Sequence, residues 1–214
     1  GLTEPDFGSD PSSMSTKAIK CNDHYILNGN KTWISNSPIA DVFVIWAKQD
    51  DRVKGFILDR SMEGIITPKI EGKMSLRASV TGMINLDEVK VPIENVLDVT
   101  GMRGPFSCLN NARLGISFGV LGSAEYCIEK SIEYSLNRKM FGQSLAEKQL
   151  LQMKLANMST EYNLALLSCL HVADNVDKKQ FKPEMISLIK RNSCQKSLEI
   201  VRTCRDIFGG NGIS

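Results

Sequence analysis

Short apolar runs separated by turn residues fill the first hundred positions, a pattern typical of β-strands. The clearest run is Asp41–Lys48, which is rich in β-branched and aromatic side chains. A polar turn at residues 49–52 leads into a second run, Val53–Leu58. Before them, Tyr25–Leu27 ends at Asn28-Gly29, a strong two-residue hairpin signal. Further strands are predicted at residues 31–34, 65–70, 83–86 and 89–91. Frequent turns between short strands predict a small, barrel-like β domain.

The pattern takes on a helical period from about Pro105. Mostly apolar residues then recur every three or four positions, which predicts a first helix with one buried face. That face consists of Leu109, Ala112, Ile116, Val120, Ser123 and Cys127. The helix is predicted to end near residues 138–142, with Gly142 as its stop. Its glycines at 115, 119 and 122 predict either tight helix packing or a close approach by a ligand or another backbone.

A second helix is predicted from about Ala146, and it carries a heptad seam. The seam residues are Leu151, Leu155, Met158, Tyr162, Ala165, Cys169 and Val172. A third helix is predicted with Pro183 in its first turn and Phe208 near its end. Because strands and helices are segregated along the chain, we predict an α+β fold. Residues 1–100 would form the β domain and residues 101–214 an antiparallel helical bundle.

The composition excludes several classes of site. Hydrophobic residues make up 42% and charged residues 23% of the 214 positions, and the formal net charge is only +2. Neither a nucleic acid nor an anionic membrane is therefore an expected partner. The six cysteines form no C-x-x-C pair and there are only two histidines, so no metal site and no disulfide framework is expected. The most apolar run, Leu114–Ala124, is too short for membrane insertion.

The opening loop and the strand after it carry the most promising ligand-binding groups. Thr3 and Ser9 offer hydroxyls, and Trp33 offers an indole able to cover a flat, polar-edged cofactor. Each group also has an ordinary interpretation, which is turn bonding for the hydroxyls and strand packing for the indole. No residue of the chain can be nominated as a catalytic acid or base from these patterns.

Two arginines and one glycine run have similarly divided interpretations. Arg113 lies among apolar positions, so it needs either a structural carboxylate or an anionic substrate as its partner. Arg138 is either a phosphate contact or a favourable charge at a helix terminus. Residues 209–212 follow a helix, which fits a helix C-cap and does not fit a dinucleotide or P-loop fingerprint.

Six motifs follow one another in a fixed order along the chain. They are LTEPDFGSDP at residues 2–11, TWISNS at 32–37, LRASVTG at 76–82, VPIENVL at 91–97, RKMFGQSL at 138–145 and DIFGGNGIS at 206–214. Together they resemble the acyl-CoA dehydrogenase family. Residues 36–48, 104–116 and 183–194 resemble its glutaryl-CoA branch in particular. The resemblance implies a middle β domain followed by an incomplete C-terminal helical bundle. The family's N-terminal helical domain would precede this stretch, so the chain is expected to be an internal fragment.

The resemblance also implies an FAD site that two subunits share. The cofactor-binding residues would be Leu2, Thr3, Ser9, Trp33, Ser35, Arg138, Phe141, Gln149, Asp206, Ile207, Phe208, Gly209 and Gly210. The residues from Arg138 onward would reach the FAD of a neighbouring subunit. The acyl-CoA substrate would lie along Ser9, Phe106, Asn110 and Arg113.

The implied reaction is α,β-dehydrogenation of an acyl-CoA thioester, in which the β-hydrogen passes as hydride to FAD. In the glutaryl-CoA branch, decarboxylation then gives crotonyl-CoA and CO2. The family's catalytic glutamate would lie downstream of Ser214, so this stretch alone is expected to be inactive. Alternative interpretations are a short- or branched-chain acyl-CoA dehydrogenase, or a non-catalytic helical assembly module of the same fold.

The implied partners are further copies of the chain, arranged as a homotetramer, and an electron-transfer flavoprotein as electron acceptor. The expected location is the mitochondrial matrix in a eukaryote or the cytoplasm in a bacterium.

Overall fold

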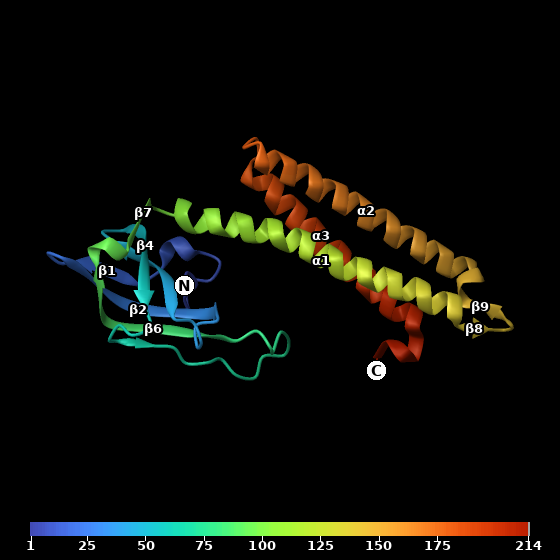
Figure 1. Cartoon of the computed structure of the whole chain (residues 1–214), viewed down its shortest axis with the longest axis horizontal. Coiled ribbons are helices and arrows are strands. Elements are labelled where there is room, and N and C mark those ends of the chain that lie inside the picture. Colours follow the sequence, from blue (N-terminus) through green and yellow to red (C-terminus); the bar gives the residue numbers. More distant parts are fainter. Residues whose placement is uncertain (214) are drawn as a thin grey trace. The chain divides into compact units, whose positions relative to one another are not determined.

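The structure is a computed structural model that describes residues 1–213. It divides into two compact units, Gly1–Ser107 and the residues from Cys108 onward, and each is described by itself. The first unit is built on a β-sheet and the second on helices (Figure 1). The α+β fold predicted from the segregated pattern is therefore confirmed.

The first unit contains one seven-stranded sheet with the order β5-β6-β2-β1-β3-β4-β7. Its strands are β1 (Lys17–Lys20), β2 (His24–Ser35), β3 (Val42–Gln49), β4 (Arg52–Asp59), β5 (Ile65–Ile66), β6 (Thr81–Pro92) and β7 (Val96–Thr100). Neighbouring strands of this sheet are antiparallel, except for the short parallel pairing of β1 with β3. Short 3-10 turns lie at Pro11–Ser13 and Ile93–Asn95.

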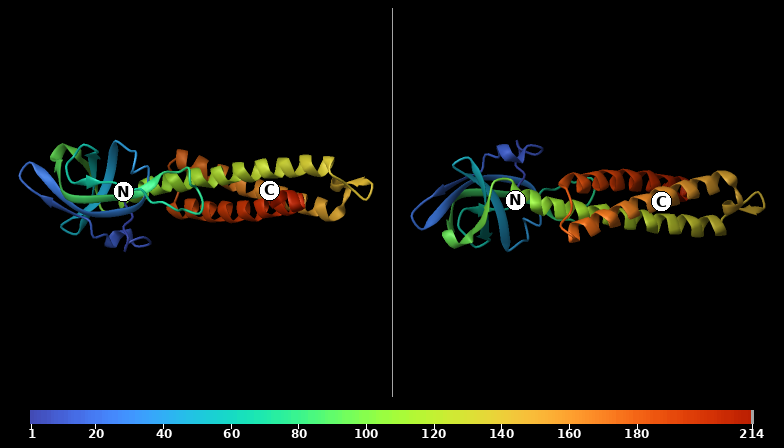
Figure 2. Two further views of the ribbon diagram at one scale, coloured as in Figure 1. Left: turned by 90° about the horizontal axis from the view of Figure 1, so that it is seen from below. Right: turned by 90° about the horizontal axis from the view of Figure 1, so that it is seen from above.

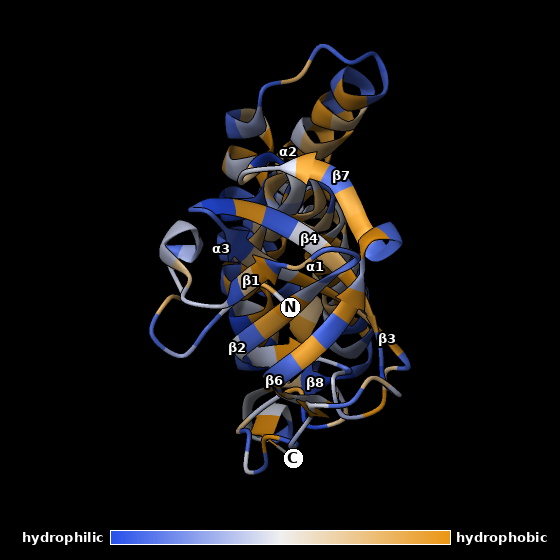
Figure 3. Ribbon diagram, turned by 90° about the vertical axis from the view of Figure 1, so that its left-hand side faces the viewer, coloured by the Kyte–Doolittle hydropathy of each residue, from blue (hydrophilic) through white to orange (hydrophobic). Residues whose placement is uncertain are grey.

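One face of the sheet carries the core of this unit. Hydrophilic and hydrophobic residues alternate along β2 and β6 (Figure 3), as expected of strands with one buried face. Ile45, Phe56, Leu58, Ile84 and Val89 are completely buried there. Burial of each such side chain stabilises the fold by about 1.5–3 kcal/mol.

The predicted hairpin at Asn28-Gly29 is wrong, because β2 continues through it as one strand. Gly29 has φ +150° and sits at a register shift between β2 and β6, so the dipeptide forms a β-bulge. The Asn28 side chain bonds across the sheet to Glu88, accepting from its backbone N–H at 2.8 Å and donating to its carboxylate at 2.5 Å. A Cβ at Gly29 would meet Thr16 at 2.4 Å, so this position requires glycine.

The other strand predictions are confirmed in part. β3 and β4 lie where the apolar runs predicted them, whereas residues 83–86 and 89–91 belong to the single strand β6. β1 and β7 were not predicted, because neither has a strong apolar alternation in the sequence.

The second unit contains three helices connected by short segments, and the first of these helices begins in the last residues of the first unit. They are α1 (Arg103–Asn137), α2 (Gln149–Asp177) and α3 (Pro183–Phe208). Both views in Figure 2 show them running side by side. A hairpin of β8 (Lys139–Met140) and β9 (Gln143–Ser144) follows α1, and 3-10 turns occupy Leu145–Glu147 and Gly209–Ile213. Within residues 1–213, no helix has the length and apolar character needed to cross a membrane.

The helical seam of α2 is confirmed, but the predicted face of α1 is wrong. Leu151, Met158, Ala165, Cys169 and Val172 are buried on α2, as the heptad pattern predicted. From Cys108 onward, the buried residues of α1 are instead Ser117, Leu121, Ala124, Ser131 and Ser135, whereas Ile116 of the predicted face is half exposed. The apolar residues of α1 surround the helix, so the period alone did not select a face.

The stop predicted at Gly142 is wrong, and the glycines of α1 show no tight packing within the described residues. No atom lies within 4 Å of a Cβ built at Gly115, Gly119 or Gly122, so the described chain makes no close approach there. α1 ends at Asn137, and Gly142 occupies the turn of the β8–β9 hairpin with φ +76°. Its neighbour Phe141 also has a positive φ, which type I′ hairpin turns require.

Candidate functional site

A bulge in β2 presents Trp33 to solvent beside the opening loop. The register of β2 on β6 shifts between Lys31 and Ile34, and Trp33 between them has φ +58°. A bulged residue turns its side chain away from the regular alternation, and the indole of Trp33 is 61% exposed. The backbone N–H of Thr32 donates to the carbonyl of Thr3 at 2.9 Å. The opening loop and the bulge are thereby joined.

The hydroxyls predicted to bind the flavin in this unit are open for a ligand. Thr3 is half-buried, whereas Ser9 and Ser35 are exposed. Among residues 1–213, none of these three hydroxyls makes a hydrogen bond. Leu2 is different, since its side chain packs on the apolar cluster of Met14, Trp46 and Val53. Leu2 therefore reaches a ligand through its backbone or the exposed part of its side chain only.

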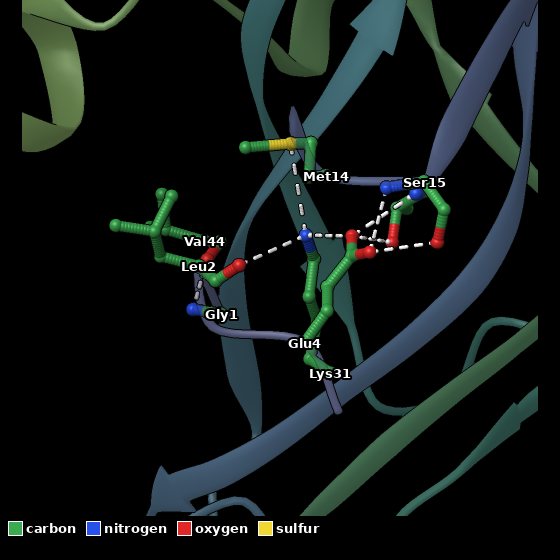
Figure 4. A network of polar contacts seen from close by, with 8 residues as sticks. Gly1, Leu2, Glu4, Met14, Ser15, Lys31 and Val44 are labelled. Atoms are coloured by element: carbon green, nitrogen blue, oxygen red, sulfur yellow. Dashed lines mark hydrogen bonds and ion pairs between the residues drawn. The ribbon is translucent and has the colours of Figure 1, made fainter. Parts of the chain in front are cut away.

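A buried ion pair of Glu4 and Lys31, which neighbour Thr3 and Thr32 along the chain, was not predicted from the sequence (Figure 4). Lys31 Nζ lies 2.8 Å from Glu4 Oε1, and both side chains are at most 1% exposed. The carboxylate of Glu4 also accepts from the backbone and hydroxyl groups of Ser15 and Thr16, at distances of 2.5–3.0 Å. Strand alternation was the sequence signal that could have predicted this burial, because Lys31 occupies an inward-facing position of β2. It pairs there with Ile84 of β6.

The protonation of this pair follows from its surroundings. Burial alone would raise the pKa of Glu4, but the bonds from Lys31, Thr16 and Ser15 outweigh it and lower the pKa to about 2. Burial also lowers the pKa of Lys31, against the opposing effect of Glu4. Glu4 is consequently a carboxylate at neutral pH, and it holds its partners through charge-assisted bonds.

In the second unit, three predicted cofactor residues gather around the hairpin after α1. Phe141 at the hairpin turn is 92% exposed, and Arg138 and Gln149 are also exposed. Phe141 and Gln149 line one depression of about 480 Å³, together with Leu145 and Leu150. The guanidinium of Arg138 makes no hydrogen bond or ion pair among the described residues. This end of the bundle offers an apolar surface next to a free cation.

The end of α3 lies at the same end of the bundle. Asp206 forms an ion pair with Lys154 of α2. Phe208 stacks on Tyr134 of α1, with ring centroids 4.4 Å apart. Ile207 is buried, so only its backbone can contact a ligand, whereas Gly209 and Gly210 are exposed. Tyr134 was not predicted, and its only sequence signal was an aromatic position near the end of the first helix.

The predicted substrate residues lie on α1 at a helical spacing. Phe106 is 45% exposed, while Asn110 and Arg113 are half-buried. Steps of four and three place all three on one side of the helix. The sequence left open a structural carboxylate as the partner of Arg113. No such partner exists within residues 1–213, so its charge is available to an anion.

These groups fit FAD in their chemistry. An exposed indole beside free hydroxyls suits a flat ring with polar edges, and a free arginine suits a phosphate. The structure gathers Thr3, Trp33 and Ser35 in the first unit. It gathers Arg138, Phe141, Gln149 and the residues 206–210 at one end of the second.

The chain thus combines a sheet unit with a three-helix unit, and each carries groups that suit FAD. Residues 1–89 match the family model "Acyl-CoA dehydrogenase, middle domain", and residues 100–214 match "Acyl-CoA dehydrogenase, C-terminal domain". The chain belongs to the acyl-CoA dehydrogenase family, whose members use FAD.

Three relatives illustrate the range of the match. The chain is 43% identical to a solved glutaryl-CoA dehydrogenase of Mycobacterium smegmatis in complex with FADH2, with a TM-score of 0.96, and it covers 56% of that protein. It is 40% identical over 175 residues to glutaryl-CoA dehydrogenase of Desulfococcus multivorans, which is 78% of this chain and 45% of that protein. Over an alignment of 218 positions, it is 35% identical to the caffeyl-CoA reductase-Etf complex subunit CarC of Acetobacterium woodii. That alignment covers 99% of this chain and 58% of that protein. The chain thus spans about half the length of its relatives.

Proposed function

We propose that the protein containing this chain is an FAD-dependent acyl-CoA dehydrogenase that acts on glutaryl-CoA. The observation that carries the proposal is the open set of Thr3, Ser35 and Trp33 on a bulged strand, because its hydroxyls and indole have no partner within the described chain. The identity to glutaryl-CoA dehydrogenases from two bacteria supports this substrate.

The chain's own residues have distinct tasks in this proposal. The hydroxyls of Thr3, Ser9 and Ser35 bond the polar edge of the flavin, and Trp33 covers part of its ring system. Arg138 neutralises phosphate charge in the FAD of a neighbouring subunit. Bound FAD accepts the β-hydrogen of the substrate as hydride. We assign no catalytic base among residues 1–213.

The substrate side is proposed to follow α1. Phe106 offers apolar surface for the acyl or pantetheine chain, and Asn110 offers an amide for polar atoms. The free charge of Arg113 draws the anionic ester. We further propose a homotetramer and an electron-transfer flavoprotein as electron acceptor. The name of the A. woodii relative, a subunit of a caffeyl-CoA reductase-Etf complex, supports Etf as a partner.

The test uses the complete protein that contains this chain. After reconstitution with FAD, we expect one flavin per subunit and turnover of glutaryl-CoA with release of CO2. Preferred turnover of butyryl-CoA without CO2 would support a short-chain enzyme instead. Absence of both flavin binding and turnover would support a non-catalytic assembly module.

A pair of serine variants tests the assigned flavin contacts. Ser35→Ala is expected to weaken FAD binding by about fivefold, since one hydrogen bond contributes about 1 kcal/mol. Ser75→Ala is the matched control, because Ser75 is also exposed, lies in the same unit and has no side-chain hydrogen bond. Equal FAD affinity in both variants would remove Ser35 from the site.

A further inference from the structure

The ammonium group of Lys31 contacts residues of the opening loop. Its Nζ donates to the carbonyl of Leu2 at 3.2 Å and to Glu4 at 2.8 Å, and it lies 3.8 Å from the sulfur of Met14 (Figure 4). Both ends of the opening loop, Leu2–Glu4 and Met14–Thr16, are therefore held by a single side chain from β2. Glu4 completes the closure, because its carboxylate binds Ser15 and Thr16.

A buried ion pair is a poor choice for stability alone. Removing two charges from water costs free energy that their attraction roughly balances, and apolar side chains of similar size often serve as well. The pair does something that an apolar contact cannot, since its hydrogen bonds have fixed directions and lengths. Its presence among the completely buried Leu27, Ile45 and Ile84 therefore points to a requirement for geometry.

The ion pair fixes the backbone next to Trp33, a residue whose own backbone conformation is strained. Thr32, the residue after Lys31, binds the carbonyl of Thr3, the residue before Glu4. Trp33 follows with φ +58°, a backbone conformation that a bulky side chain adopts only when its surroundings enforce it. Beyond it, Ile34 pairs with Gly82, where a Cβ would approach Pro68 O and Ser37 Oγ within 2.7 Å. The backbone is thus held in place on both sides of the bulge.

We propose that Lys31 and Glu4 are positioning residues for the flavin, which fix Thr3 and Trp33 in one arrangement before FAD binds. This inference rests on the proposed flavin function. Neither side chain is exposed, so neither touches the cofactor itself. Lys31 and Glu4 hold the opening loop in one conformation in advance, so the loop loses no further conformational entropy when FAD binds. Ordering even one residue reduces affinity by roughly tenfold.

The experiment compares three forms of the complete protein prepared without FAD. The double variant Lys31→Met/Glu4→Gln removes both buried charges at once, so no unpaired charge remains in the core. Leu58→Ala is the control, because Leu58 is completely buried in the same sheet and makes no contact in the ion-pair network. FAD affinity is measured by titration, and amide hydrogen exchange is followed in a peptide covering residues 30–36.

We expect the double variant to bind FAD about tenfold more weakly and to exchange the Thr32 amide faster. Leu58→Ala is expected to lower the melting temperature but to leave the FAD affinity and the exchange rate of the Thr32 amide near those of the wild type. FAD affinity within about twofold of the wild type in the double variant, or an equal loss in Leu58→Ala, would overturn the proposal.

Two further results separate this proposal from the function on which it rests. If the wild-type protein binds no FAD, the flavin function fails, while hydrogen exchange still reports whether the pair orders Thr32. If the double variant does not fold, Thr16→Val decides, because it removes only one bond to Glu4. We expect this variant to bind FAD about threefold more weakly, and unchanged affinity would overturn the proposal.

Discussion

The ring of Tyr134 on α1 stacks on the ring of Phe208 at the end of α3, with centroids 4.4 Å apart and planes inclined by 22°. The Tyr134 hydroxyl also accepts from Asn211 Nδ2 at 3.2 Å. One side chain thereby secures both the last turn of α3 and the glycine-rich turn that follows.

Tyr134→Ala is expected to lower the free energy of unfolding by about 2 kcal/mol, because an aromatic pair and its buried area are lost. Tyr134→Phe retains the stacking, so its cost is expected to be only about 0.5–1 kcal/mol. Tyr126→Ala on the same helix is the control, since Tyr126 is 61% exposed. Chemical denaturation followed by helical circular dichroism measures all three. A cost for Tyr126→Ala as large as that for Tyr134→Ala would contradict the assignment.

The ion pair of Glu4 predicts a dependence of stability on pH. Its pKa is lowered from 4.5 to about 2, so the carboxylate stabilises the fold at neutral pH. This contribution is complete above about pH 4.5 and is lost as the pH falls toward about 2. The difference in unfolding free energy between wild type and Glu4→Gln should therefore shrink between pH 5 and pH 2. A difference that stays constant over this range would show that Glu4 does not titrate as inferred.

Gly209 and Gly210 offer a matched pair for the end of α3. Gly209 is the C-cap, with φ +57° and ψ −129°, a backbone conformation that is almost restricted to glycine. Gly209→Ala is expected to cost about 1–3 kcal/mol of stability. Gly210 has no positive φ, and a Cβ there would meet no atom within 4 Å, so Gly210→Ala should be nearly neutral. Equal melting temperatures for the two variants would contradict this distinction.

Phe141 is expected to trade stability for cofactor binding. It has φ +53° at a turn where asparagine is preferred, and its ring is 92% exposed. Phe141→Asn is expected to raise the free energy of unfolding by about 0.5–1 kcal/mol. If the ring contacts FAD as proposed, the same change will weaken FAD binding. Thermal melting and FAD titration of the complete protein measure both effects. Unchanged FAD affinity would exclude Phe141 from the site.

The sequence was most informative where a single physical signal dominated. Pro183 in a first turn and Gly209 after Phe208 bracket α3, and the helix has those bounds. The heptad seam of α2 likewise identified its buried side, because the seam residues recur at the spacing of one helix face, whereas other apolar residues of α2 such as Leu164 and Leu167 are exposed.

Competing local signals explain the failures. Asn28-Gly29 has the composition of a hairpin turn, but pairing of β2 with β6 on both sides of it leaves the dipeptide as a bulge. Lys31 was not singled out from the sequence, since its burial depends on Glu4, which is far away along the chain.

The long pairing of β2 with β6 has a consequence for how the chain folds. It sets His24 opposite Pro92 and Ser35 opposite Thr81, with β3, β4 and β5 lying between them in sequence. Folding slows as paired segments lie further apart along the chain, whereas helix pairs such as α2 and α3 form from neighbouring segments. During synthesis, one edge of β2 therefore stays unpaired until β6 emerges, and an open edge invites association with other chains. Changes that delay β6 will thus reduce the yield of soluble protein before any ligand group is altered.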